Sequence, residues 1–187
     1  VSINVSNVIL YDNVANYRGG GMYIQSAYGA LGKIADILIE NVTLSSNTSN
    51  QLGGGICVRD MNVLLKNAII WNNIPESIAF FEGYSFTSNL TISYSDIEGA
   101  ITGIIPNQNE VINLEGNISL DPLLIFDHYL GGSGLWGILD SLSPCINAGN
   151  PDPQFNDYDG SRNDMGGFGG PLSNYYPISI NTNINCD

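Results

Sequence analysis

The sequence predicts an all-β fold, a right-handed parallel β-helix (solenoid) of about four to five coils with a C-terminal cap. Three observations lead to this prediction. Blocks of sequence recur along residues 1–115, each block contains short strands that end at Asn or Gly, and a segment of different character follows. Stacked coils account for all three, because each coil buries its inward side chains against the coils on either side.

The first two blocks align without a gap at an offset of 34 residues. NVILYDN at residues 7–13, followed by VANYRGGGMYI, aligns with NVTLSSN at residues 41–47, followed by TSNQLGGGICV. This alignment places the triple glycine of residues 19–21 on that of residues 53–55. Such agreement is rare by chance, so the two blocks are predicted to be equivalent coils whose glycines let the chain turn sharply.

Two further copies extend the repeat. NAIIWNN at residues 67–73 follows 26 residues after the second block, and a weaker copy spans residues 90–97. Alternating apolar runs, such as ILI at 37–39 and VLL at 63–65, indicate short strands. Asn at the corners can adopt left-handed backbone angles and bond to the Asn of the next coil. A β-sandwich or a propeller would show longer strands and hairpin dipeptides, and only Asp159–Gly160 is of that kind.

Composition restricts the classes of partner. Hydrophobic residues make up 43% of the chain and charged residues only 12%, with 18 acids, five bases and a net charge of −13. A nucleic acid or an anionic membrane would find no basic patch, so neither is expected as a partner. The apolar runs are too short for a transmembrane span. The sequence begins in mid-pattern, which predicts further coils of the same chain or a stacking partner at the N-terminal end.

The three cysteines are too few for a disulfide framework or a metal cluster. Cys57 replaces an aliphatic residue in a strand pattern, so it is predicted to be a small core residue rather than a reactive thiol. Cys145 and Cys186 could pair and thereby hold the tail.

From Gly116 the repeat stops and a different segment begins. It contains SLDPLL at 119–124, SPCINAGNP at 143–151 and DYDGSRNDMGGFGG at 157–170. In these motifs and in its repeats, the chain resembles bacterial surface and secreted proteins with right-handed parallel β-helix repeats, of the pectin-lyase-like superfamily. Their last coil is followed by a cap with the pattern DP-L/F, SPCI-AG and D-DG-R-D-GA-GG. This chain departs from that pattern at Gly167, where the family often has Ala.

The resemblance covers nearly the whole chain and implies three parts. They are parallel coils over residues 1–115, a final coil and cap over residues 116–172, and a tail or linker over residues 173–187. The resemblance also implies an extracellular or bacterial cell-surface location, commonly without enzymatic activity. The residues expected to build the structural cap are Asp121, Cys145, Gly149 and Arg162.

An acidic loop within the cap is the best candidate for a metal site. Asp157, Asp159 and Asp164 follow the pattern Asp-x-Asp-Gly-x-x-x-Asp, which offers the oxygen ligands that a Ca²⁺ ion needs. Against calcium, the loop lacks the bidentate Glu of an EF-hand, and Arg162 could neutralise the acids itself. Two interpretations therefore stay open, a Ca²⁺ site and an Arg–Asp cluster that locks the cap.

These features predict a non-enzymatic surface module that acts as an adhesive, glycan-contacting or structural spacer element. Its expected partners are polysaccharides or other surface proteins. Aromatic side chains between the strands could stack on sugar faces, or they could cover the core where loops leave it open. These aromatic residues are Tyr17, Tyr23, Tyr28, Phe80, Phe81, Tyr84 and Phe86.

The alternative is a polysaccharide lyase or glycoside hydrolase whose active groove lies mainly on coils upstream of Val1. Such an enzyme needs converging acids and a base. The charged residues that could approach one face are Arg59, Asp60, Lys66, Asp96 and Glu98. They form no recognisable motif and are expected to be isolated surface charges. His128 has no Ser or Cys partner motif nearby, which favours a surface or cap role, so no catalytic residue is assigned.

Overall fold

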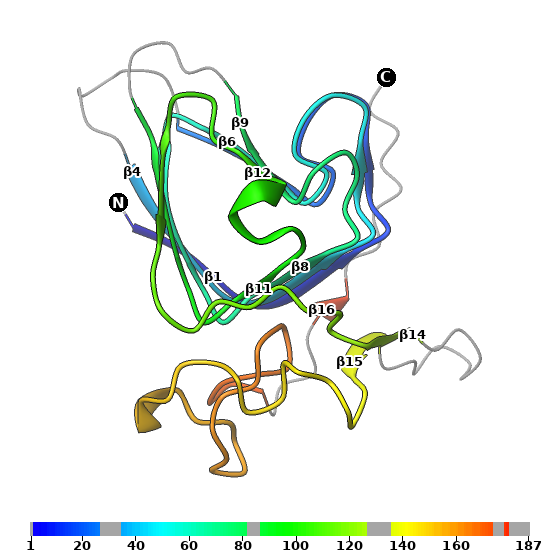
Figure 1. Ribbon diagram of the computed structural model, residues 1–187, viewed down its shortest axis with the longest axis vertical. Helices are drawn as coiled ribbons and strands as arrows, with labels where there is room; N and C mark the ends of the chain where they lie inside the picture. The colour runs from blue at the N-terminus through cyan, green and yellow to red at the C-terminus, as the bar shows by residue number, and fades with distance from the viewer. Residues whose placement is uncertain (1, 27–34, 82–86, 127–135, 174–177, 180–187) are drawn as a thin grey trace.

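The computed structural model describes residues 2–26, 35–81, 87–126, 136–173 and 178–179. Short parallel strands dominate it and form two main curled sheets (Figure 1). The larger sheet contains β1 (Ser2–Tyr11), β4 (Ala35–Ser45), β7 (Met61–Lys66), β8 (Ile69–Trp71), β10 (Asn89–Ser93), β11 (Asp96–Ile97), β13 (Glu110–Asn113) and β16 (Ile178–Ser179). The smaller sheet contains β3 (Met22–Gln25), β6 (Ile56–Arg59), β9 (Ile78–Phe80) and β12 (Ile104–Ile105).

The remaining elements are short. Strands β2 (Val14–Ala15) and β5 (Thr48–Ser49) form a parallel pair, whereas β14 (Leu124–Phe126) and β15 (Trp136–Leu139) are antiparallel. Helical structure in the described residues consists of two 3-10 turns, η1 (Ala100–Gly103) and η2 (Pro153–Phe155). None of the helices in this described part is long and apolar enough to cross a membrane.

The strand registers confirm the repeat alignment. Ile9 pairs with Thr43 between β1 and β4, and Thr43 in turn pairs with Ile69 between β4 and β8. These pairs reproduce the offsets of 34 and 26 residues read from the sequence. The weak fourth copy also falls in register, since Asp96 of β11 pairs with Ile69. Recurring sequence therefore identified the strands that lie side by side.

The bends of the repeats are left-handed at equivalent positions, which lie within β1 and β4 and between the shorter strands of the later repeats. Asn7, Asn41 and Asn67 have φ values of 51°, 50° and 50°, and Tyr94 continues the series at 50°. Asn tolerates this region better than most residues, because its short amide can bond to nearby backbone. The sequence-based prediction for the corner asparagines is confirmed in this respect.

A ladder of asparagines, separate from the left-handed positions, joins successive repeats through side-chain hydrogen bonds. The Asn13 amide donates to Asn47 Oδ1 at 3.0 Å, and the Asn47 amide donates to Asn73 Oδ1 at 3.0 Å. The Asn47 amide also donates to the carbonyl of Leu10. All three side chains are buried, so these bonds satisfy groups that would otherwise be costly to bury.

The core lies inside the curled sheets and follows the two-residue period of the strands. In β7, Met61, Val63 and Leu65 are buried while the residues between them are partly exposed. The triple glycines allow the backbones of adjacent repeats to lie close together. Gly53 has a φ of +64°, and a Cβ on Gly54 would overlap the backbone of Ile74 in the next repeat.

The predicted right-handed parallel β-helix is wrong as a description of this architecture. The strands are mostly parallel, as in α/β proteins, but they form curled sheets that resemble a half-barrel and do not close into a solenoid. The linking strands β2 and β5 form a separate two-stranded sheet, and the strands shorten from 11 residues in β4 to two in β11 and β12. Sequence recurrence predicts which strands pair, but it does not predict whether the sheets close into a solenoid.

The C-terminal segment, residues 140–173, lies against the outer face of the larger sheet, below β1, β8 and β11 in Figure 1. It covers four residues that pair in register across successive repeats, which we call the outer stripe: Ile9, Thr43, Ile69 and Asp96. All four side chains are buried, although their neighbours in the sequence point into the core. Beyond this segment, β16 pairs with β1.

Candidate functional site

The three aspartates proposed for calcium are each held by backbone groups of the C-terminal segment. Asp157 accepts hydrogen bonds from the backbone N–H groups of Asp164 and Gly170, and Asp164 accepts one from Asn147 at 2.7 Å. Asp159 is exposed and accepts from the N–H and the hydroxyl of Ser161. Among the described residues, no three His, Cys, Asp or Glu side chains gather as a metal group would. The Ca²⁺ site stays a prediction.

Burial changes the acidity of these carboxyl groups. Desolvation raises the pKa of Asp157 to about 6, partly offset by the N–H of Gly170. Desolvation also raises the pKa of Asp164. Hydrogen bonds from Ser161 lower the pKa of Asp159 instead. Two of the three candidate ligands therefore favour the protonated form more than a free aspartate does.

Arg162 and Gly149 lie together, as expected of cap residues, but through backbone contacts. Arg162 Nε donates to the Gly149 carbonyl at 2.8 Å, and its Nη2 donates to the Ala148 carbonyl at 3.2 Å. Gly149 also packs closely on Asn163. Within the described residues Arg162 forms no ion pair with an acid, so the Arg–Asp interpretation of the lock is not what the geometry supports.

Cys145 meets a buried acid that belongs to the repeats. Its thiol donates to Asp96 Oδ2 at 3.1 Å, and the other carboxylate oxygen accepts from the N–H of Leu120 at 3.1 Å. Both side chains are 0% exposed. Burial raises the pKa of Asp96 to about 6, with the negative charge of Asp121 adding to the shift. Burial likewise raises the pKa of the Cys145 thiol, which keeps it protonated and unreactive.

Asp96 was not recognised from sequence as the partner of Cys145. The signal was present, because Asp96 occupies the position that Ile9, Thr43 and Ile69 occupy in the other repeats. An acidic residue at a position that is apolar or uncharged in the other repeats indicates that the acid binds a specific partner. Asp121 itself is exposed and accepts from the N–H of Leu123, a local turn contact.

The corner asparagines also bind the C-terminal segment. Asn7 donates to the carbonyl of Gly169 at 2.8 Å, and Asn41 donates to Asn163 Oδ1 at 3.0 Å. In the third repeat the direction reverses, since Asn67 Oδ1 accepts from the backbone of Asn150 at 2.8 Å. Equivalent positions of three repeats thus form a polar track for this segment.

Two of the five basic side chains meet on one aromatic ring of the smaller sheet. The guanidinium carbon of Arg18 lies 3.7 Å from the centroid of the Phe81 ring, and that of Arg59 lies 5.0 Å from it. We call these three residues the arginine cluster. Cation–π attraction holds both guanidinium groups against the ring. Neither arginine was singled out with Phe81 from sequence, because the three lie in different repeats.

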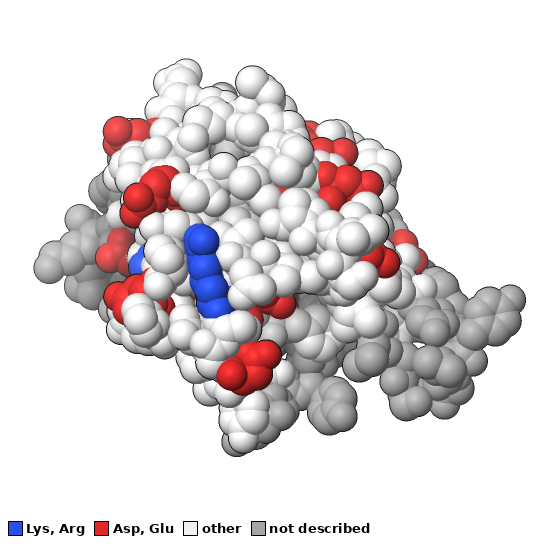
Figure 2. All heavy atoms as spheres, turned by 60° about the horizontal axis from the view of Figure 1, so that its bottom comes forward, with Lys and Arg blue, Asp and Glu red and all other residues white. Residues whose placement is uncertain are grey.

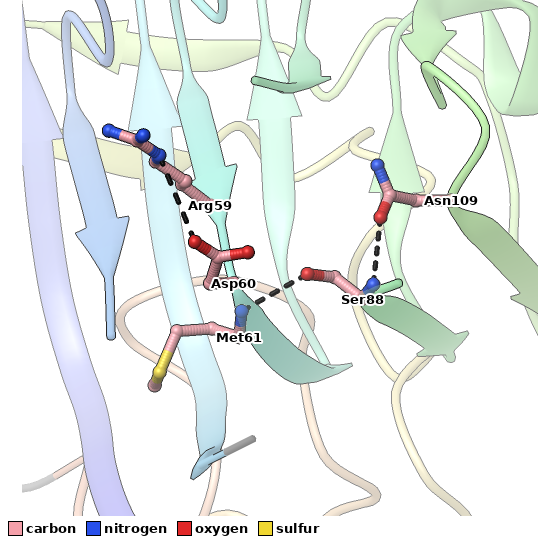
Figure 3. Close-up of polar contacts among 5 residues, drawn as sticks. All are labelled: Arg59, Asp60, Met61, Ser88 and Asn109. Carbon is pink, nitrogen blue, oxygen red and sulfur yellow. Dashed lines mark hydrogen bonds and ion pairs between the residues drawn. The ribbon is translucent and has the colours of Figure 1, made fainter. Parts of the chain in front are cut away.

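The turn after β6 positions Arg59 (Figure 3). Asp60, at the left-handed corner with a φ of 51°, lies beside Arg59 with Nε and Oδ2 3.9 Å apart. The side chains of Arg59 and Asp60 are only 11% and 13% exposed. Next in the chain, the N–H of Met61 donates to Ser88, whose own N–H donates to Asn109 in the following repeat. The side chain of Arg59 extends away from Ser88 and Asn109.

Two exposed aromatic residues lie close to the arginine cluster along the chain or in strand register. Tyr17 is 67% exposed and Tyr23 is 41% exposed, whereas Phe80 is buried in the core. Tyr23 of β3 pairs with Cys57 of β6, two positions before the pair of Gln25 with Arg59. Tyr28, Tyr84 and Phe86 lie outside the described residues.

Of the residues considered for an enzymatic role, Arg59 and Asp60 lie side by side, whereas the other three have separate surroundings. Asp96 is enclosed by the C-terminal segment, Glu98 accepts from the backbone N–H of Asn72, and Lys66 lies near the ring of Phe155. Cys57 is fully buried, as predicted, and burial raises its pKa to about 11. His128 and Cys186, with the suggested pairing to Cys145, fall outside the described residues.

Comparison of the chain with protein-family models, with curated proteins and with solved structures finds no match.

Proposed function

We propose that the chain is a non-catalytic, glycan-contacting module of an extracellular or cell-surface protein. The observation that carries the proposal is the exposure of Tyr17 and Tyr23 on the first repeat, next to the arginine cluster. Tyrosine rings left in water on an ordered framework are suited to stack on the apolar faces of sugars. The hydroxyl and the nearby guanidinium groups can bond to sugar hydroxyls.

The backbone that carries these tyrosines is held by the second repeat. The N–H of Gln51 donates to the carbonyl of Tyr17 at 2.9 Å, and the N–H of Gly19 donates to the carbonyl of Leu52 at 3.0 Å. Strand β3, which contains Tyr23, pairs along its length with β6. A surface ordered in this way loses little conformational entropy when it binds a ligand.

The surface on the side of the C-terminal segment carries few charges (Figure 2). Acidic side chains occur in separate groups, and most of the face shown in Figure 2 is uncharged. Polysaccharides or other surface proteins are the partners that we propose. A further repeat or a stacking partner against β1 belongs to the same proposal, since within the described residues β16 covers that edge of the strand at Val8 and Ile9 alone.

A panel of immobilised neutral and acidic glycans tests this function. We expect saturable binding of the chain to at least one of them, weakened at least tenfold by Tyr17→Ala or Tyr23→Ala. Tyr158→Ala is the matched control, because Tyr158 is also exposed but lies in the C-terminal segment. Absence of binding, or an equal loss in the control, contradicts the proposal. Release of shorter sugar products from the panel would instead support the lyase or hydrolase.

A further inference from the structure

The arginine cluster concentrates positive charge on a strongly acidic chain. Two of five basic residues share the Phe81 ring in a protein with a net charge of −13. Asp60 approaches Arg59, but Arg18 forms no ion pair within the described residues. Two guanidinium groups at one ring repel each other, so the pair is more stable when a further negative charge is present.

Glu76 is an acid that, like Arg18, lies within electrostatic reach of Cys57, and it already accepts a hydrogen bond. Both Arg18 and Glu76 affect the acidity of Cys57, so both lie near that thiol. Glu76, however, accepts a hydrogen bond from the backbone N–H of Gly53 at 2.9 Å. The thiol between them stays protonated at neutral pH, because burial raises its pKa to about 11. Neither group neutralises Arg18 as a paired carboxylate would.

One hydrogen-bond donor of Arg18 has no partner among the described residues. Its Nε is buried and has no hydrogen-bond partner. Buried donors in folded proteins are nearly always paired, so this unpaired donor is a candidate to bind the oxygen of a ligand. Nε and the adjacent Nη of an arginine form a planar fork that fits two oxygens of a carboxylate or a sulfate.

We infer that the arginine cluster binds an oxyanion group, a carboxylate or a sulfate, with Arg18 as the principal ligand-binding residue. Phe81 orients the guanidinium groups, and Arg59 adds a second positive charge. The inference rests on the proposed function, in which Tyr23 contacts a sugar ring and the cluster binds the acidic group of the same ligand. It makes the preferred ligands acidic rather than neutral.

Calorimetric titration of the whole chain with sodium sulfate and with sodium acetate, at constant ionic strength set by chloride, tests the inference. We expect saturable binding of at least one anion, weakened at least tenfold in Arg18→Met and less than twofold in Lys66→Met. The control removes the same charge from a site distant from Phe81. Which anion binds more tightly distinguishes a sulfated from a carboxylated ligand. Equal weakening in both variants, or no binding beyond chloride, overturns the inference.

Arg18→Lys keeps the charge and removes the fork. We expect it to bind the anion at least threefold more weakly than the original chain, and unchanged binding would contradict the role of the fork. The glycan panel separates the two proposals. Binding that is equal for neutral and acidic glycans and insensitive to Arg18→Met rejects the oxyanion site alone. Anion binding without any glycan binding rejects the glycan function alone.

Discussion

The repeats and the C-terminal segment are stabilised in different ways. In the repeats, one contact recurs at equivalent positions, as in the ladder from Asn13 through Asn47 to Asn73. In the C-terminal segment each contact occurs once, as when Arg162 binds the carbonyl of Gly149 or Asp157 binds the N–H of Gly170. Recurring contacts make the repeats predictable from sequence, whereas single contacts make the C-terminal segment dependent on individual residues.

The repeats and the C-terminal segment meet along the outer stripe, and the contacts there affect the stability of the fold. Thr43 accepts a hydrogen bond from the N–H of Gly167 at 2.9 Å, and Ile69 packs on Cys145 and Met165. A Cβ on Gly167 would clash with Ile9, which accounts for glycine where the resembled pattern often has alanine. At Asp96 the contact is an ionisable group, so the attachment of the C-terminal segment depends on pH.

The largest effect is expected in the repeats. Gly54→Ala places a Cβ against the backbone of Ile74, which cannot move without separating two repeats. We expect the free energy of unfolding to fall by about 3 kcal/mol in urea titrations. Gly160→Ala is the control, because nothing lies within contact of its Cβ position and only its φ of +87° opposes the change. A loss no larger than that of the control would show that the repeats tolerate separation.

A smaller effect, and one that depends on pH, is expected where the regions meet. Burial raises the pKa of Asp96 from an unfolded value near 3.8 to about 6, so the folded state binds its proton more tightly. The contribution to stability is therefore fully present below about pH 3.8 and is lost progressively as pH rises through 6, a change of about 2–3 kcal/mol. Asp157, with its pKa also raised to about 6, acts in the same direction.

Asp96→Asn sharpens this prediction, since the amide keeps the size and the acceptor for the N–H of Leu120. We expect urea unfolding at pH 4.5 and pH 7.5 to differ less in the variant than in the original chain. The variant should be the more stable of the two at pH 7.5. An unchanged pH dependence would mean that Asp96 does not couple the C-terminal segment to the repeats.

The smallest effect is expected at the exposed end of the acidic loop. Asp159→Asn should change the free energy of unfolding by less than about 0.5 kcal/mol without added metal, because Asp159 is exposed and, among the described residues, accepts its hydrogen bonds from Ser161. The same variant tests the calcium prediction. Thermal unfolding that shifts upward with Ca²⁺ in the original chain, and less in Asp159→Asn, would support a site there. No shift in either would reject it.

Sequence reasoning succeeded where neighbouring repeats share the same residue types. The offset between residues 7–13 and residues 41–47 predicted the pairing of Ile9 with Thr43. The left-handed corners at Asn7 and Asn41 also followed, because few other residues adopt that conformation readily. Sequence reasoning wrongly predicted that the sheets close into a solenoid, because a shared pattern says nothing about the short strands that link the two sheets.

The sequence by itself determined the parallel strands and their registers, because both depend on residue types that recur at fixed spacing. Only the tertiary structure decided that the sheets form a half-barrel, that Cys145 meets Asp96, and that Arg18 and Arg59 share the Phe81 ring. The physical reason is that these contacts join unlike residues far apart in the chain. Their energies depend on burial and distance, which exist only after the chain has folded.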